Sequence, residues 1–328
     1  MRLFVILAVA CCNASVALAG GSFNGPPPGA PASFKGVVKE WDVPTPSFPR
    51  DPAIAPDGSV YYVLLFGDKL SHFDPVTEKF KEWDLPRGTR PHNVLVDPAG
   101  IVWITAQGAG AIGRFDPATE RFTWYRVRAG GDPHTQILPP DGNLWFTMAG
   151  ARRVGRLDRT SGAITEWSMP GHPYGITAAP DGSIWVCLIE EHQLARLDPH
   201  TGAIDTIDLG AGAQPFRLAA DQAGHLYATL GGPNELARID PATRKVDKRW
   251  KLPAGSQGNA YAVTIDGAGT VWVNELKSDT LVRFDPRDES MQVIPLPSKR
   301  AAIRKMVVDQ QGRLWYLGTN NAKLGRVE

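Results

Sequence analysis

The chain has 328 residues, of which 43% are hydrophobic and 21% charged, and its 35 basic residues almost balance its 34 acidic ones. This balance excludes nucleic acids and anionic membranes as expected partners, because both select proteins with a basic surface. Beyond the N-terminus, no apolar stretch is long enough to cross a membrane.

The first residues predict an exported protein. Arg2 supplies a positive start, residues 3–10 form an apolar core, and Ala17-Leu18-Ala19 has the small side chains of a cleavage site. Residues 1–19 are therefore predicted to be a signal peptide, and the mature chain is expected to be secreted or periplasmic. Its removal leaves 34 basic against 34 acidic residues.

The three cysteines bear on processing and on stability. A second interpretation of the N-terminus makes Cys11 or Cys12 the lipid-carrying residue of a lipoprotein, but Ala8 stands where such signals favour a large aliphatic side chain. In the mature chain only Cys187 remains, so no disulfide can form within it. Cys187 lies in an apolar segment, which favours a small core residue over a nucleophile.

Residues 20–33 are rich in glycine and proline and predict an extended linker. The folded part is expected to span residues 34–328. It starts with residues 36–43, which have the pattern of an outer β-strand without a partner strand before it.

A three-part repeat runs through the rest of the chain. A turn glycine recurs at intervals of 42, 42, 40, 42, 45 and 43 residues, at Gly58, Gly100, Gly142, Gly182, Gly224, Gly269 and Gly312. Three residues later stands a large aromatic residue: Tyr61, Trp103, Trp145, Trp185, Tyr227, Trp272 or Trp315. Eleven residues after that stands a basic one: His72, Arg114, Arg156, Arg196, Arg238, Arg283 or Arg326. A period of about 40 to 50 residues with short β-type segments is typical of a propeller blade.

The second copy shows the strands of one blade. They are expected at residues 92–96, 101–105, 111–115 and 121–127, with turns at Asp97-Pro98-Ala99-Gly100 and at Asp116-Pro117. Seven such copies predict an all-β fold, a seven-bladed β-propeller of four-stranded antiparallel blades.

The last copy ends at Glu328 after its third strand. Residues 36–43 are therefore expected to supply the missing fourth strand and close the ring. A closed ring leaves few free strand edges, and a monomer is expected.

Residues present in every blade are interpreted as structural. The repeated aromatic residue is expected to fill the wedge between neighbouring blades, and the repeated Asp-Pro to set a tight turn. The repeated arginine is likewise interpreted as structural, rather than as one of seven binding cations.

Function is sought where equivalent positions differ on one face of the ring. The position eleven residues before each aromatic residue marks the entry to the first strand: Arg50, His92, His134, Tyr174, Phe216, Tyr261 and Arg304. The position three residues after it ends the second strand: Leu64, Ala106, Met148, Leu188, Leu230, Glu275 and Gly318. This channel mouth is expected to bind a polar or anionic small molecule. The alternative is that the ring is polar there only because it meets water.

Within this mouth, His92 and His134 lie one blade apart and are the expected catalytic residues. Asp132 could orient an imidazole or hold a metal ion. The expected substrate-binding residues are Arg50, Tyr174, Tyr261, Arg304 and Glu275. For Glu275 the alternative is neutralisation by Arg304 or Lys305.

Three segments carry a family resemblance: Pro173-Tyr174-Gly175-Ile176-Thr177, Asp181-Gly182-Ser183-Ile184-Trp185 and Ile112-Gly113-Arg114-Phe115. They are similar to blades of the virginiamycin B lyase, or streptogramin lyase, family of seven-bladed propellers, and the resemblance covers residues 34–328. It implies a magnesium-assisted elimination that opens a cyclic depsipeptide antibiotic at its ester and so confers antibiotic resistance. A histidine base removes the proton next to a metal-polarised carbonyl, and the ester carboxylate leaves.

Mapped onto this chain, the family's two imidazoles fall on His92 and His134, and its nearer carboxylate falls on Asp132. The resemblance then implies His134 as the base, His92 as the assisting acid or metal-proximal group, Asp132 as a metal ligand and Mg²⁺ as the cofactor. The family's farther carboxylate falls on Met148, which cannot supply an oxygen ligand.

Two functions therefore stay open. One is an exported virginiamycin B lyase-like propeller that eliminates at a carbon–oxygen bond of a cyclic depsipeptide or a similar ester. The other is a non-catalytic propeller of the periplasm that binds a small molecule or a protein. A six-bladed, metal-dependent lactonase is disfavoured by the count of seven repeats.

Overall fold

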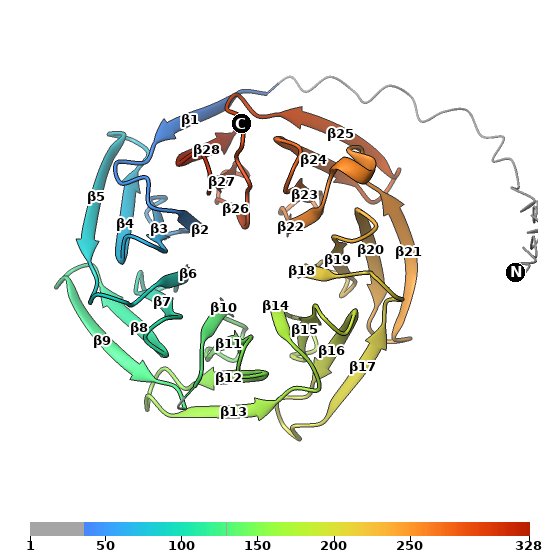
Figure 1. The fold of residues 1–328 in the computed structure, drawn as a ribbon, viewed down its shortest axis with the longest axis horizontal. Helices are drawn as coiled ribbons and strands as arrows, with labels where there is room; N and C mark the ends of the chain where they lie inside the picture. Colours follow the sequence, from blue (N-terminus) through green and yellow to red (C-terminus); the bar gives the residue numbers. More distant parts are fainter. Residues whose placement is uncertain (1–35, 129) are drawn as a thin grey trace, which may run out of the picture. The chain divides into compact units, whose positions relative to one another are not determined.

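The computed structural model describes residues 36–128 and 130–328. The predicted signal peptide and linker, with Cys11 and Cys12, lie outside the described residues. The described residues form seven sheets of four antiparallel strands each. The sheets form a ring, and their first strands surround its central axis, which is called the channel below (Figure 1). The fold is thus the predicted seven-bladed β-propeller.

The blades follow one another along the chain. Blade 1 contains β2 (Pro49–Ile54), β3 (Val60–Leu64), β4 (Lys69–Asp74) and β5 (Lys79–Asp84). Blade 2 contains β6 (Pro91–Val96), β7 (Val102–Ala106), β8 (Ala111–Asp116) and β9 (Arg121–Arg126). Blade 3 contains β10 (Pro133–Ile137), β11 (Leu144–Met148), β12 (Arg153–Leu157) and β13 (Ile164–Ser168). Blade 4 contains β14 (Pro173–Ala178), β15 (Ile184–Leu188), β16 (Gln193–Leu197) and β17 (Ile204–Asp208).

The remaining blades complete the ring. Blade 5 contains β18 (Pro215–Ala220), β19 (Leu226–Leu230), β20 (Glu235–Asp240) and β21 (Lys245–Lys251). Blade 6 contains β22 (Ala260–Ile265), β23 (Val271–Glu275), β24 (Thr280–Asp285) and β25 (Ser290–Pro295). Blade 7 contains β26 (Met306–Val308), β27 (Leu314–Gly318), β28 (Lys323–Val327) and, from the other end of the described chain, β1 (Val38–Asp42).

The ring closes through β1, as predicted. This strand pairs antiparallel with β28, from Val38 opposite Val327 to Asp42 opposite Lys323. The first and last strands of the described residues thereby lie in one sheet (Figure 1). Without β1, the outer edge of β28 would be an unpaired strand edge.

The repeated aromatic residues lie between blades, as predicted. Trp103 of blade 2 is buried in one cluster with Leu144 and Phe146 of blade 3. Trp315 of blade 7 is buried with Val60 and other side chains of blade 1. These clusters are the hydrophobic core, and each joins two neighbouring blades.

The repeated arginine and glycine also have structural causes. Arg326 is paired opposite Trp315 across β28 and β27, and its guanidinium carbon lies 5.3 Å from the centroid of the indole ring, which is cation–π geometry. The seven turn glycines have φ angles from 74° to 94°. Side chains other than hydrogen disfavour this region, which explains why the glycine recurs.

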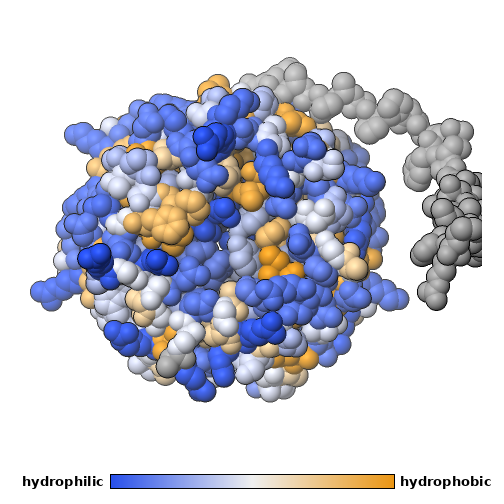
Figure 2. All heavy atoms as spheres, in the orientation of Figure 1, coloured by the Kyte–Doolittle hydropathy of each residue, from blue (hydrophilic) through white to orange (hydrophobic). Residues whose placement is uncertain are grey.

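Helix is nearly absent from the described residues, where a single short 3₁₀ turn, η1 (Gly255–Gln257), connects blades 5 and 6. Within this part of the chain, no helix has the length and apolar character needed to span a bilayer. The surface in Figure 2 is largely hydrophilic, with separate hydrophobic patches. The large hydrophobic side chains exposed among the described residues are Val37, Phe66 and Val76.

Candidate functional site

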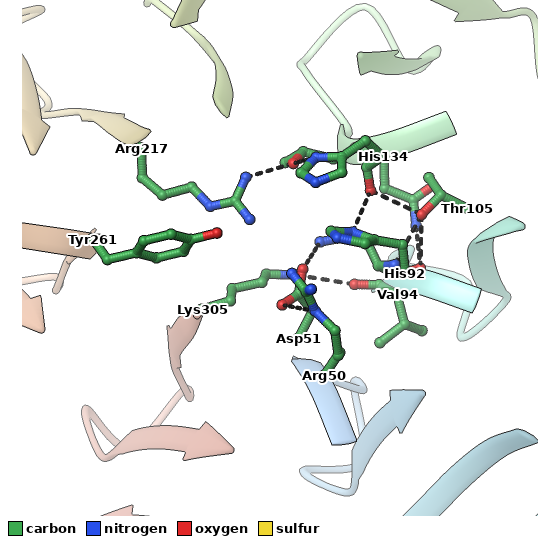
Figure 3. Close-up of polar contacts among 12 residues, drawn as sticks. Arg50, Asp51, His92, Val94, Thr105, His134, Arg217, Tyr261 and Lys305 are labelled. Carbon is green, nitrogen blue, oxygen red and sulfur yellow. Dashed lines mark hydrogen bonds and ion pairs between the residues drawn. The ribbon is translucent and has the colours of Figure 1, made fainter. Parts of the chain in front are cut away.

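The candidate site lies where the first strands of the blades line the central channel. In blades 1–6 these strands change register near their start, for example between Pro133 and Gln136 in β10. A β-bulge of this kind breaks the strict alternation of a strand and re-aims side chains. As a result, consecutive residues such as Arg50 and Asp51 of β2 reach the same volume in the channel (Figure 3).

Threonine hydroxyls in the second strands fix these irregular segments to the next blade. The Thr105 hydroxyl accepts the backbone N–H of Asn93 at 2.8 Å and donates to the carbonyl of His134 in blade 3 at 2.9 Å. Thr229 repeats the arrangement between blades 5 and 6. The bulged backbone groups thus find partners, and the site residues of adjacent blades are held together.

His92 and His134 form a buried pair with tilted rings. Their ring centroids lie 3.7 Å apart at an interplanar angle of 34°, and the two residues are only 3% and 4% exposed. Nδ1 of His92 lies 3.1 Å from the backbone carbonyl oxygen of His134. Nδ1 of His134 lies 2.9 Å from the Thr135 hydroxyl. The structure therefore brings the two imidazoles into direct contact.

Both imidazoles are held neutral. Burial is the largest cause that lowers the pKa of His92 well below its usual value, and the charges of Arg50 and Arg217 act in the same direction. Burial also lowers the pKa of His134 well below the usual value, followed by the effects of His92, Arg217 and Arg50. Neutral imidazoles each keep one lone pair, which can accept a proton.

These shifts predict a loss of stability in mild acid. Because the folded pKa values of both histidines lie below those of the unfolded chain, the unfolded state binds more protons, and stability falls as pH drops through about 6.5. From about pH 7.5 to about pH 5.5, the free energy of unfolding should fall by about 2–3 kcal/mol for the pair. Urea unfolding at the two pH values measures this loss. Replacing His92 and His134 by glutamine should remove most of it, whereas replacing the exposed His200 should not.

An aromatic wall borders the imidazole pair. The ring of Tyr174 lies 4.4 Å from that of His134 between centroids, and the hydroxyls of Tyr174 and Tyr261 are hydrogen-bonded to each other. Phe216 stacks on Tyr261 at 4.6 Å, and the guanidinium carbon of Arg304 lies 5.5 Å from the Tyr261 ring centroid. The expected substrate-binding residues Arg50, Tyr174, Tyr261 and Arg304 thus share the channel with the histidines.

Two charged residues in this volume were not expected from the sequence, and a third, Lys305, was expected only as a partner of Glu275. Arg217 of β18 donates to the Thr135 hydroxyl, Asp51 lies 3.6 Å from Arg50 between Oδ1 and Nε, and the Lys305 ammonium donates to the carbonyl of Val94 at 3.0 Å. All three occupy the position after the one used to mark the strand entry. That position is occupied around the ring by Asp51, Asn93, Thr135, Gly175, Arg217, Ala262 and Lys305. Its variation between blades is the sequence signal that could have identified these residues.

The structure places Asp132 and Glu275 in loop-anchoring contacts. The carboxylate of Asp132 accepts the backbone N–H groups of Gly150 and Ala151 at 2.9 and 3.1 Å. The carboxylate of Glu275 accepts from the Asn234 side chain at 2.6 Å and from the Ala254 N–H at 2.9 Å. Each carboxylate thus ties loops together, and the structure shows neither of them in contact with the imidazole pair.

The side chains around the imidazoles do not fit a magnesium ion. Mg²⁺ requires oxygen ligands, yet the described residues contain no group of three His, Cys, Asp or Glu side chains that could hold a metal ion. Met148 is fully buried in the hydrophobic cluster between blades 2 and 3. Asp51, the carboxylate that lies close to the pair, is surrounded by Arg50, Arg217 and Lys305. No step of the chemistry below is routed through a metal.

Comparisons with known proteins agree with this architecture. The model of the virginiamycin B lyase family matches residues 90–328, more than half of the chain. A streptogramin B lyase structure is 22% identical, with a TM-score of 0.82 over 89% of this chain and 97% of that one. Virginiamycin B lyase from Staphylococcus aureus is 20% identical, with a TM-score of 0.82 over 89% of this chain and 99% of that one. No curated protein matches.

The ring also resembles a binding protein. The structure of YCF48 bound to D1 peptide is 12% identical, with a TM-score of 0.74 over 90% of this chain and 97% of that one. At identities this low, the structural matches establish the fold alone. The family match over residues 90–328 goes further, and it agrees with the seven closed blades and the repeat. The chain belongs to the virginiamycin B lyase family.

Proposed function

We propose that this chain is an exported, monomeric virginiamycin B lyase-like enzyme that binds a cyclic depsipeptide or a similar ester at the channel mouth and eliminates at its carbon–oxygen bond. The observation that supports this most is the pair of neutral imidazoles in contact with one another, 3.7 Å apart between centroids, beside the guanidinium groups of Arg50 and Arg217. A neutral imidazole is the base that proton removal next to a carbonyl requires. Guanidinium groups can stabilise the oxyanion that forms.

Hydrogen bonding favours His92 as the base. Its Nδ1 faces a backbone carbonyl, which can only accept, so Nδ1 carries the proton and Nε2 carries the lone pair. The Thr135 hydroxyl accepts a hydrogen bond from Arg217, so the hydroxyl proton of Thr135 can be donated to Nδ1 of His134. The proton of His134 then lies on Nε2. This assignment reverses the roles that the family resemblance implies for the two histidines.

The elimination then proceeds with the chain's own groups. Nε2 of His92 takes the proton from the carbon next to the substrate carbonyl, and the electrons of that bond form an enolate near Arg50 and Arg217. The enolate expels the ester oxygen with the electron pair of the carbon–oxygen bond. The leaving group departs as a carboxylate, which needs no proton, and the imidazolium of His92 returns its proton to water.

A second candidate function is a non-catalytic binding propeller. It is favoured by Met148, which is buried in the core at the position where the family resemblance calls for a carboxylate. The same ring fold in YCF48 is described with a bound peptide, and a fold alone does not decide between binding and catalysis.

The test is incubation of the purified protein with a streptogramin B antibiotic, in magnesium and in EDTA, followed by chromatography and mass spectrometry. Elimination gives a linear product of unchanged mass, whereas hydrolysis gives one that is heavier by one water. We expect the linear isomer, and we expect His92→Ala to slow its formation by about 10²–10⁴-fold, the usual contribution of a general base.

His200→Ala is the matched control, because the His200 side chain is 90% exposed. If the wild-type protein forms no linear isomer in either buffer, it is not a streptogramin lyase. Binding of the antibiotic without turnover would favour the second function. If product forms in magnesium but not in EDTA, the enzyme needs a metal ion, and the side chains around the imidazoles do not account for its ligands.

A further inference from the structure

The centre of the ring gathers more positive than negative charge. Arg50 enters from blade 1, Arg217 from blade 5 and Lys305 from the segment before β26 (Figure 3). Arg304 precedes Lys305 in the same segment. Arg50 and Arg217 are only 4% and 7% exposed. The carboxylate of Asp51 faces three of these cations, Arg50, Arg217 and Lys305. Buried arginines are normally paired with anions, because an unpaired buried charge is strongly unfavourable.

Several of the buried guanidinium nitrogens have no hydrogen-bond partner among the described residues. They are Nε and Nη2 of Arg50, Nε and Nη2 of Arg217, and Nε of Arg304. Folded proteins leave few buried donors without a partner. Two planar guanidinium groups with free N–H donors are suited to the oxygens of an anion.

Two ionisable neighbours respond to the same positive field, whereas the pKa of Tyr174 is raised, mainly by burial and by its neighbour Tyr261. Burial tends to raise the pKa of Tyr261, but the charges of Arg217, Arg50 and Arg304 outweigh burial and lower it. The same balance lowers the pKa of Asp51, through Arg50, Arg217 and Lys305. Both shifts favour the negative form of the group, as expected in a site that attracts anions.

We propose that the channel mouth binds the oxyanion of a small organic acid between the guanidinium groups of Arg50 and Arg217, with the organic part against the wall of Tyr174, Phe216 and Tyr261. This inference rests on the proposed small-molecule site, and it holds whether or not the ligand is turned over. In the elimination, the same groups would hold the carboxylate that leaves. The aromatic wall favours an acid with an apolar or aromatic body over inorganic phosphate.

The experiment is isothermal titration calorimetry of the full protein with benzoate and with benzamide, its neutral analogue of similar shape. We expect saturable binding of benzoate and at least about 10-fold weaker binding of benzamide, because charge-assisted hydrogen bonds to both arginines require the negative charge. Arg217→Gln should weaken benzoate binding about 10- to 100-fold. Arg114→Gln, at a structural arginine of blade 2, should leave it unchanged.

Arg50→Lys is the second variant if Arg217→Gln does not fold. It keeps the charge and loses the planar fork, so benzoate binding should weaken while the protein stays folded. Equal affinity for benzoate and benzamide would overturn the proposal. So would the absence of any stabilisation of the folded protein by benzoate or by phosphate at up to about 10 mM. If phosphate binds and benzoate does not, the ligand is not an organic acid, and this outcome too would overturn the proposal. Ultraviolet absorbance of a Tyr261 phenolate near neutral pH would also overturn it, since the phenolate would then be the counter-ion.

These outcomes are separable from those of the lyase assay. Benzoate binding without antibiotic turnover leaves an anion-binding propeller and removes the lyase. Antibiotic turnover without benzoate binding keeps the lyase and removes the anion site.

Discussion

Trp41→Ala is expected to lower the free energy of unfolding by about 3–5 kcal/mol, the usual range for an aromatic core side chain replaced by alanine. Trp41 is 9% exposed, although it lies on β1, an outer strand at the end of the described chain. Its ring stacks on Trp315 at 5.8 Å and packs on Phe73 at 4.9 Å between centroids. The substitution therefore leaves a cavity between blades 7 and 1, where the ring closes.

The matched control for this prediction is Val37→Ala, just before β1, because Val37 is 63% exposed. It should change the free energy of unfolding by no more than about 0.5 kcal/mol. Urea unfolding followed by tryptophan fluorescence and by circular dichroism measures both variants. If Trp41→Ala costs no more than Val37→Ala, the pairing of β1 with β28 does not hold the ring closed. Removal of residues 1–42 should in addition expose the edge of β28 and cause association between molecules.

The repeat was sufficient to predict the fold, because each of its residues has a local physical role. The glycine marks a turn with a positive φ angle, and the aromatic residue marks the strand that fills the space between blades. Ring closure could also be predicted, because residues 36–43 have the pattern of the outer strand that the seventh copy lacks. Such inferences need only the period of the repeat and the chemistry of turns and cores.

The residues that meet in the candidate site could be predicted only in part. His92, His134, Tyr174 and Tyr261 meet because equivalent positions in a ring face the same channel. Asp51 was not expected, since strict alternation of a strand sends consecutive residues to opposite faces. A β-bulge turns the Asp51 side chain into the channel. Such a bulge depends on hydrogen-bond partners in other strands, so the repeat pattern does not reveal it.

Asp132 shows a second limit of the sequence. Its position two residues before His134 suggested a ligand or an orienting group, yet its two oxygens accept backbone N–H groups of a loop. A carboxylate that caps a loop and a carboxylate that binds a metal have the same sequence signal. Only the folded chain shows which N–H groups come within hydrogen-bonding distance.

The two arginines of the site can supply the positive charge that the expected elimination requires. The family resemblance implies a cation that polarises a carbonyl and stabilises the resulting oxyanion. Arg50 and Arg217 are fixed positive charges in the same volume, and they can stabilise an oxyanion without a metal. Burial is the main reason that both imidazoles stay neutral, and the two arginines add to it. Neutral imidazole is the state that a general base needs.

Asp51→Asn is expected to lower the free energy of unfolding by about 3–5 kcal/mol near neutral pH, because it removes the carboxylate that faces Arg50, Arg217 and Lys305. Asp247→Asn is the control: Asp247 makes a bidentate pair with Arg238 near the surface, with distances of 2.6 to 3.2 Å, and its loss should cost about 0–1 kcal/mol. Burial lowers the pKa of Lys305 to about 8 even though Asp51 counteracts it. Above that pH the lysine is neutral, so the deficit of Asp51→Asn should shrink at higher pH, as urea unfolding across the pH range can measure. A deficit as small as that of Asp247→Asn would mean that the cations of the channel do not depend on Asp51.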